Sequence, residues 1–229
     1  MIAKAPSGIC IALASSKGGC AKTSTIANLA VRAAEESRRV AAIDYDPQLS
    51  LARWYELRGE PINPRVWEPG SHGASADVER LRQQGADWIF LDLPPAIQHI
   101  IRSGIEAADL VVIPIKPSPI DLEAIDPIID LCERYERPYV FLLAMFDPKW
   151  KLSETARPYL EKRAPGHTLQ EVLSYRQAYV GSMIGGQTGP EYNQDAKQAR
   201  AARDEVEALW QAIKHEAMKA ARARGMHDR

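Results

Sequence analysis

The sequence has little cysteine, almost no net charge and no long apolar run, and each shortage excludes a class of protein. The three cysteines, Cys10, Cys20 and Cys132, lack CxxC spacing, which argues against a disulfide framework or a zinc site and fits a reducing compartment. With 29 basic and 30 acidic residues, nucleic-acid binding would need a local patch or an assembled oligomer. No stretch is apolar for about 18 residues, and the start is too short in its apolar part for a signal peptide. We therefore expect a soluble, cytoplasmic protein.

Short apolar runs alternate with stretches of helical periodicity along the 229 residues, which is the pattern of an α/β fold. The runs predicted to be buried strands of a mostly parallel sheet are 9–14, 40–43, 88–91, 110–115 and 139–145. The helices predicted around them are 22–36, 49–57, 76–84, 97–107, 120–135 and 154–163. The sequence therefore predicts a single domain, 1–229, built on a doubly wound, mostly parallel sheet flanked by helices.

Three further segments have less regular patterns. Residues 169–173 are a possible sixth strand, although polar and apolar residues around them do not alternate clearly. Residues 59–75 are rich in proline and glycine and are expected to form a surface loop with at most one short strand. The final segment, about 190–224, is predicted to be a helix that begins near Pro190 and packs its apolar face on the domain.

A glycine turn follows the first predicted strand and leads directly into the first predicted helix. A loop in this position points several backbone N–H groups at one spot, where the helix dipole adds partial positive charge, so the spot suits phosphate. Gly18 and Gly19 allow close approach of the backbone, Lys22 can reach the terminal phosphates, and the Thr23 hydroxyl group can ligate Mg²⁺. The alternative is an ordinary strand-to-helix turn.

The strict phosphate-loop pattern, G-x-x-x-x-G-K-[ST], is not met, because Ser16 and Ala21 occupy its glycine positions. Residues 17–23 instead match K-G-G-x-x-K-[ST], the deviant Walker A motif, and on this motif the chain resembles the ParA/MinD superfamily of dimerising ATPases. The resemblance implies that Lys17 reaches across a dimer interface to the phosphates bound by the partner subunit, so that two monomers sandwich ATP. Alanine at position 21 replaces the usual glycine and would be strained if the site requires a positive φ. The implied nucleotide-binding residues are Lys17, Gly18, Gly19, Cys20, Ala21, Lys22, Thr23 and Ser24.

Acidic residues follow two predicted strands, at the edge where α/β sheets place their ligands. Residues 88–92 are four apolar residues and an aspartate, the Walker B arrangement, in which Asp92 would hold Mg²⁺ through its water shell. Residues 44–48 are similar to the family's D-x-D-P-Q, which implies that Asp44 lies near Mg²⁺ and that Asp46 positions the attacking water. A simple turn at the strand end is the alternative. The predicted metal residues are Thr23, Asp44 and Asp92, and the predicted catalytic residues are Lys17, Lys22 and Asp46.

The resemblance covers most of the chain. Residues 108–122 look like the family's A-D-L-V-I-I-P-x-x-P-S-P-x-D stretch, whose prolines and Asp121 are expected to shape the dimer face. Relatives hold the base near the end of a later strand, which would place Phe146 and Pro148 close to adenine. The likeness is closest to small plasmid-type ParA proteins, and we expect no added N-terminal DNA-binding domain, because the phosphate loop begins at residue 15.

ParA-type relatives bind DNA without sequence preference through basic residues near the C-terminal part of the fold. The candidates here are Arg176, Arg200, Arg203 and Lys214. Because residues 190–229 include eight basic and seven acidic residues, a solvated helix of mixed charge is the alternative for Arg200, Arg203 and Lys214. MinD-type relatives bind membranes through an amphipathic C-terminal helix, but residues 218–225 offer mostly alanine methyl groups, so no membrane binding is expected.

These observations lead to the hypothesis of a ParA-like partitioning ATPase that uses ATP and Mg²⁺. Its ATP-bound homodimer would bind non-specific DNA, associate with the nucleoid, and position a plasmid, a chromosome region or a protein assembly. A ParB-like or other adaptor protein would stimulate hydrolysis to ADP and phosphate. A P-loop phosphotransferase or ligase acting on a small molecule is one alternative, against which Lys17 argues. A MinD-like membrane-associated positioning ATPase is the other.

Overall fold

The structure is a computed structural model that describes residues 8–37 and 39–227, and a parallel sheet lies at its centre. Within these residues the sheet has seven strands in the order β3-β2-β4-β1-β5-β6-β7, and every neighbouring pair is parallel. The strands are β1 (Ile9–Leu13), β2 (Val40–Asp44), β3 (Arg65–Trp67), β4 (Trp88–Asp92), β5 (Leu110–Ile115), β6 (Tyr139–Phe146) and β7 (Thr168–Ser174). The predicted fold class is therefore confirmed.

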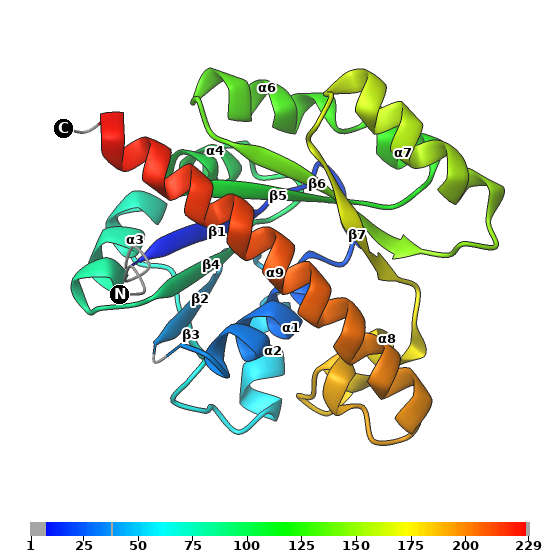
Figure 1. The fold of residues 1–229 in the computed structure, drawn as a ribbon. Helices are drawn as coiled ribbons and strands as arrows, with labels where there is room; N and C mark the ends of the chain where they lie inside the picture. The colour runs from blue at the N-terminus through cyan, green and yellow to red at the C-terminus, as the bar shows by residue number, and fades with distance from the viewer. Residues whose placement is uncertain (1–7, 38, 228–229) are drawn as a thin grey trace, which may run out of the picture.

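Helices cover both faces of the sheet (Figure 1). One face carries α3 (Ala74–Gln83), α4 (Gln98–Ala107), α5 (Pro119–Glu123), α6 (Asp126–Arg134) and α7 (Lys151–Arg163). The other carries α1 (Lys22–Ala34), α2 (Ser50–Leu57), α8 (Gln177–Ile184) and α9 (Ala196–His227), with the 3₁₀ turn η1 (Gly189–Glu191) before α9. Alternate residues of β1 belong to the two apolar clusters, since Cys10 faces one and Ile11 the other. Burial on both faces explains why the strands are almost wholly apolar.

The structure corrects two of the predicted helices and adds one. The helix predicted over 120–135 is divided into α5 and α6; Ser118 caps α5, and a proline stands in the first turn of each helix, where no N–H is needed. Helix α8 was not predicted at all. The final helix begins at Ala196, because Pro190 lies in η1. Two uncertain segments are strands: β7 contains 169–173, and β3 lies within the loop 59–75.

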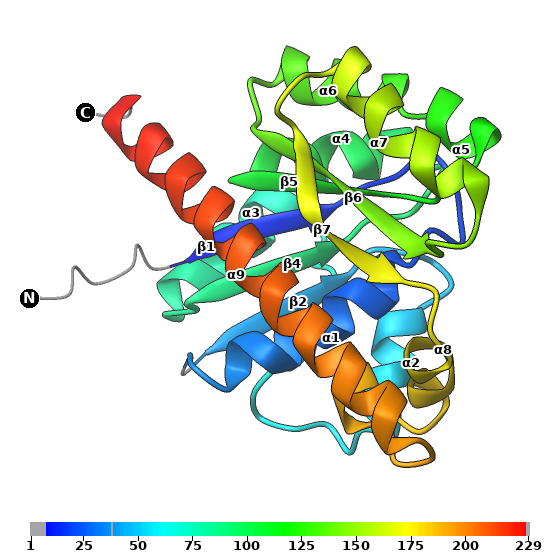
Figure 2. The same cartoon turned by 45° about the vertical axis from the view of Figure 1, so that its right-hand side comes forward.

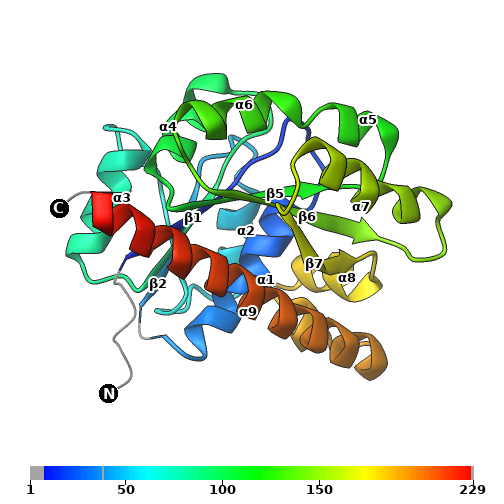
Figure 3. The same cartoon turned by 45° about the horizontal axis from the view of Figure 1, so that its top comes forward.

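Helix α9 crosses the sheet diagonally and is held at both its middle and its end (Figures 1 and 3). Trp210 is fully buried; its ring centroid lies 4.8 Å from that of Trp88, and its indole N–H donates to Glu36 Oε1 at 2.8 Å. Farther along, Arg224 Nη1 lies 3.1 Å from the buried carboxylate of Asp109. Helix α9 is thus part of the core layer. No helix in the described ranges combines the length and apolar character that a membrane crossing needs.

Candidate functional site

A cavity of about 670 Å³ lies at the edge of the sheet where the strands end. One side is the loop after β1, one end is formed by segments that follow β2 and β4, and the far side comes from β6, β7 and α8. Figure 2 shows α2 and α8 close together below the end of β7. The C-terminal ends of parallel strands meet at one edge, so segments distant in sequence converge here. We call the part formed by the loop after β1 and the segments after β2 and β4 the phosphate end, and the part formed by β6, β7 and α8 the far end. The lining residues of the phosphate end include Gly18, Gly19, Ala21, Lys22, Thr23, Ser24 and Asp46, and those of the far end are Met145, Leu173, Ser174, Tyr175, Arg176, Tyr179, Val180 and Met183.

The loop has the conformation that made Ala21 a concern. Ala21 has φ 67° and ψ 24°, in the left-handed region, and it is the N-cap of α1 without a side-chain capping bond. A residue with a Cβ atom in this region costs roughly 1–2 kcal/mol relative to glycine. The predicted strain is therefore present. Gly19, with φ 73°, accommodates a second left-handed position two residues earlier.

The two lysines of the motif face different surroundings. Lys22 is buried, lines the cavity and donates from Nζ to Ser15 Oγ at 2.9 Å. Cys20 Sγ donates to the same oxygen at 2.9 Å, and Ser15 Oγ in turn donates to the carbonyl oxygen of Lys17 at 2.7 Å. Ser15, which the sequence analysis did not assign, therefore positions Lys22; its only sequence signal is its place at the end of β1. Lys17 lies outside the cavity and donates from Nζ to the carbonyl oxygen of Ile120 at 2.7 Å.

Thr23 and Asp92 form a polar pair at the end of β4 that fits a hydrated divalent cation. Thr23 Oγ1 donates to Asp92 Oδ2 at 2.6 Å, while the buried Asp92 Oδ1 has no hydrogen-bond partner in the described part of the chain. Burial raises the pKa of Asp92 to about 7; the Thr23 hydrogen bond opposes this rise, and the nearby Asp44 carboxylate adds to it. A cation would stabilise the ionised form and satisfy the free oxygen. Because no group of three His, Cys, Asp or Glu residues suited to a metal occurs in the described ranges, water and phosphate would complete its shell, as Mg²⁺ prefers.

Asp44 and Asp46 have different roles in the turn after β2. Asp44 Oδ1 accepts from the Asp46 N–H at 3.0 Å, and Oδ2 accepts from the N–H groups of Leu51 and Ala52 at 2.9 and 3.0 Å. The Asp44 carboxylate thus caps α2, whose own N-cap residue makes no side-chain bond. Burial raises the pKa of Asp44, and these backbone hydrogen bonds oppose the rise. The position of Asp44 near Mg²⁺ stays a prediction. Asp46 lines the cavity, which a residue that positions the attacking water must do.

The lining of the far end differs from the predicted base contacts, whose contact with adenine stays a prediction. Phe146 and Pro148 do not line the cavity; Phe146 packs with the apolar cluster of the opposite sheet face, and Met145, with φ 54°, lines the cavity instead. The remaining far-end residues come from β7, α8 and the turn between them, and only Arg176 among them was named from the sequence, as a candidate for DNA binding. No local pattern in the sequence marks them as a site, because α8 itself has no clear sequence boundary.

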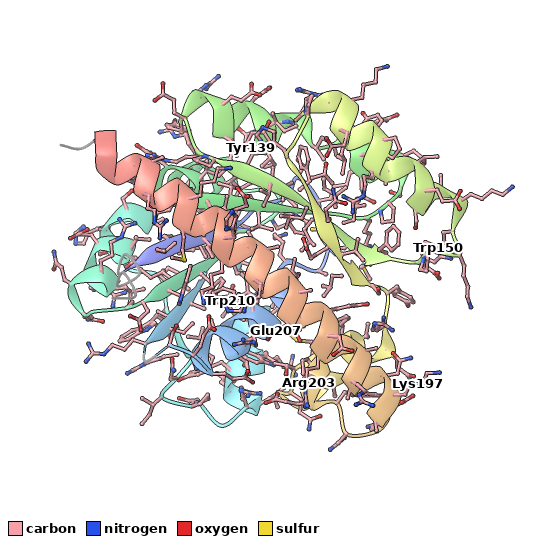
Figure 4. All side chains as sticks on the ribbon, viewed as in Figure 1. Tyr139, Trp150, Lys197, Arg203, Glu207 and Trp210 are labelled. Atoms are coloured by element: carbon pink, nitrogen blue, oxygen red, sulfur yellow. The ribbon has the colours of Figure 1, made fainter. Side chains whose placement is uncertain are left out.

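Two of the four predicted DNA-binding residues are engaged in ion pairs. Arg176 Nη2 lies 2.5 Å from Glu205 Oε1, and Lys214 Nζ lies 2.5 Å from Glu36 Oε1. Arg200 and Arg203 are exposed on α9, where Figure 4 labels Arg203, and neither forms an ion pair within the described residues. Of the four predicted DNA-binding residues, the two that are exposed and form no ion pair with a described residue therefore lie near the beginning of α9.

Comparison with known families gives a match that spans most of this architecture. The family profile described as the CobQ/CobB/MinD/ParA nucleotide-binding domain matches residues 11–209. This range includes the phosphate loop, the turn with Asp46, the Thr23–Asp92 pair and the far end of the cavity. The match therefore covers every part of the candidate site.

Individual proteins of known name are similar to this chain in sequence or in fold. The chromosome-partitioning ATPase Soj of Thermus thermophilus is 28% identical over 185 residues, covering 66% of this chain and 74% of Soj. The maintenance of carboxysome distribution protein A of Halothiobacillus neapolitanus is 30% identical over 125 residues, covering 54% of this chain and 57% of that protein. The septum site-determining protein MinD of Pyrococcus horikoshii, solved with Mg-ADP, has a TM-score of 0.66 at 18% identity, over 88% of this chain and 95% of that one.

Proposed function

The chain belongs to the CobQ/CobB/MinD/ParA nucleotide-binding family, and from this premise we propose that it is a ParA-like partitioning ATPase. Its ATP-bound form would be a homodimer that binds DNA without sequence preference and positions a plasmid, a chromosome region or a protein assembly. The observation that carries this proposal is the pair of lysines around one glycine turn, of which Lys22 lines the cavity and Lys17 does not.

The phosphate end supports binding of ATP with Mg²⁺. Lys22 and the loop amides would hold the phosphates, while Thr23 and Asp92 would hold the cation, which neutralises developing charge on the phosphates when it is bound. Asp46 would orient the attacking water from the turn after β2, at the same end of the cavity. The Asp44 carboxylate contributes by capping α2 and thereby holding the turn that carries Asp46.

The environment of Lys17 supports a dimer that depends on the nucleotide. Among the described residues, the only side-chain hydrogen bond of Lys17 is to the backbone carbonyl of Ile120, and Ile120 itself is 69% exposed. An exposed apolar side chain next to a weakly held ammonium group suits a surface that a second subunit covers. Phosphates bound by the partner would then replace the Ile120 carbonyl as the acceptor for Lys17.

The dimer is tested by light scattering coupled to size-exclusion chromatography, with ATP and Mg²⁺. We expect the wild type to dimerise transiently, Asp46→Ala to remain a dimer because hydrolysis is blocked, and Lys17→Ala to remain a monomer. Lys162→Ala, which removes the same charge from exposed α7, is the matched control and should behave as the wild type. A phosphorylated acceptor formed without any ATP-linked dimer would instead favour a phosphotransferase.

DNA binding is tested with ATP, with ADP and without nucleotide, each at two salt concentrations. The proposal assigns contacts to Arg200 and Arg203, which are three residues apart on α9 and exposed. The double variant Arg200→Ala/Arg203→Ala should reduce the slope of affinity against salt by about 2, because each lost phosphate contact removes about 1. Equal binding under all three nucleotide conditions would contradict the proposal, and binding to anionic vesicles in place of DNA would favour a membrane-associated ATPase.

A further inference from the structure

A third lysine, Lys116, lies against the phosphate loop. A Cβ atom built at Gly19 would lie 3.6 Å from Lys116 Nζ, so the ammonium group stands directly over the glycine turn. Lys116 and Lys17 also line one small hollow together with Ser16 and Cys20. The ammonium group thus reaches the loop from a part of the chain almost a hundred residues away, as Gly19 and Lys116 differ by 97 positions.

The sheet explains how Lys116 reaches the loop. Strand β5 is a direct neighbour of β1, with Leu13 in register with Val112. Whereas β1 ends at Leu13, β5 continues to Ile115, three residues beyond the partner of Leu13. Lys116 follows immediately and is therefore placed level with the loop that leaves β1.

Lys116 differs in its hydrogen bonding from Lys17 and Lys22, the two lysines of the loop itself. Lys22 donates to Ser15 Oγ and Lys17 to a backbone carbonyl, but the side chain of Lys116 makes no hydrogen bond or ion pair with any described residue. It is nevertheless only partly exposed. A half-buried ammonium group with three donors and no acceptor is costly unless an anion completes it.

We propose that Lys116 is a phosphate-binding residue that donates to the polyphosphate of the nucleotide held by its own loop. The proposal rests on the proposed nucleotide binding and adds to it a contact supplied from β5 rather than from the loop. A nucleoside polyphosphate is the anion that fits, because the same loop also presents Lys22, the N-terminus of α1 and close-approach glycines.

Titration with a fluorescent ATP analogue, at about 50 mM and about 500 mM salt, tests this role. Lys116→Met keeps the length of the side chain but removes the charge, and Lys162→Met on exposed α7 is the matched control. We expect roughly tenfold weaker binding for Lys116→Met at low salt, a smaller difference at high salt, and no change for Lys162→Met. The midpoint of thermal unfolding without nucleotide should be the same for the wild type and Lys162→Met, and equal or higher for Lys116→Met, because this substitution removes an ammonium group that has no acceptor.

Two results would overturn the proposal. One is Lys116→Met binding the analogue as tightly as the wild type at low salt. The other is a loss of binding that does not depend on salt and accompanies a lower unfolding midpoint, which would indicate a structural role. Absence of binding by the wild type and Lys162→Met alike would contradict the proposed nucleotide function itself, so the two failures are distinguishable.

Discussion

The two ends of the cavity are built in different ways. The phosphate end comes mainly from one continuous segment, in which Lys22 bonds to Ser15 and Lys22 and Thr23 lie in the first turn of α1. The far end is assembled from β6, β7 and α8, and its lining is largely apolar, with Met145, Val180 and Met183 among its residues. A charged, local structure thus faces an apolar, composite one across the same cavity.

The far end depends on a carboxylate that lies outside the cavity. Glu205 of α9 accepts from Ser174 Oγ at 2.6 Å, from Arg176 Nη2 at 2.5 Å and from Tyr179 Oη at 3.0 Å, and all three donors line the cavity. Burial and the Glu205 carboxylate raise the pKa of Tyr179, which keeps its hydroxyl group as a donor. The phosphate end is thus stabilised mainly by residues that are neighbours in sequence, whereas the far end is stabilised by α9.

The strongest test of this difference is to remove Glu205. Glu205→Ala leaves Arg176, Tyr179 and Ser174 without their shared acceptor, and we expect it to lower the free energy of unfolding by about 3–5 kcal/mol. Glu207→Ala is the matched control on the same helix; its side chain is 46% exposed in a pair with Arg32, so its loss should cost less than about 1 kcal/mol. Urea unfolding measures both. Equal effects of the two substitutions would contradict the role given to Glu205.

A second test concerns the charge at the phosphate end. Burial raises the pKa of folded Asp92 to about 7, whereas the unfolded side chain has a pKa near 4. The folded protein therefore binds more protons than the unfolded chain between about pH 4 and pH 7, and the contribution of Asp92 makes stability fall as pH rises through this window.

Asp92→Asn replaces the titrating carboxyl group by a neutral amide, whose oxygen can still accept the hydrogen bond from Thr23. Without nucleotide or metal, we expect the variant to be as stable as the wild type near pH 4 and about 3–4 kcal/mol more stable near pH 8. Chemical unfolding across this pH range measures the difference, and Asp46→Asn, at a partly exposed position, serves as the control. A difference that does not change with pH would show that Asp92 is not the titrating group.

The smallest expected change in stability comes from relieving the left-handed backbone conformation of Ala21. Ala21→Gly should raise the free energy of unfolding by about 1 kcal/mol, because glycine adopts the left-handed conformation without steric cost. Ala201→Gly, inside α9, is the control and should lower stability by about 1 kcal/mol. Thermal unfolding distinguishes the two signs. Destabilisation by Ala21→Gly would mean that the loop is not strained at this residue.

Local patterns predicted the central strands and the phosphate end well, because each depends on few and adjacent residues. The runs that became β1, β2, β4, β5 and β6 are apolar since both sheet faces are covered, and the strain at Ala21 followed from a glycine position within a motif. The break between α5 and α6 at Ala124 and Ile125 was missed, because helical periodicity continues through it. Helix α8 and the place of Phe146 were missed because nothing adjacent in sequence determines them.

A parallel α/β sheet and a phosphate loop with two lysines can be predicted from the amino-acid sequence, because they follow from apolar runs, glycines and a strand-to-helix transition within one segment. The tertiary structure alone decided which residues complete the cavity. Lys116 stands over Gly19 because β5 is paired with β1, and Glu205 supports the far end because α9 crosses β7. Both contacts join residues distant in sequence, and such contacts are determined by strand order and helix packing rather than by any local pattern.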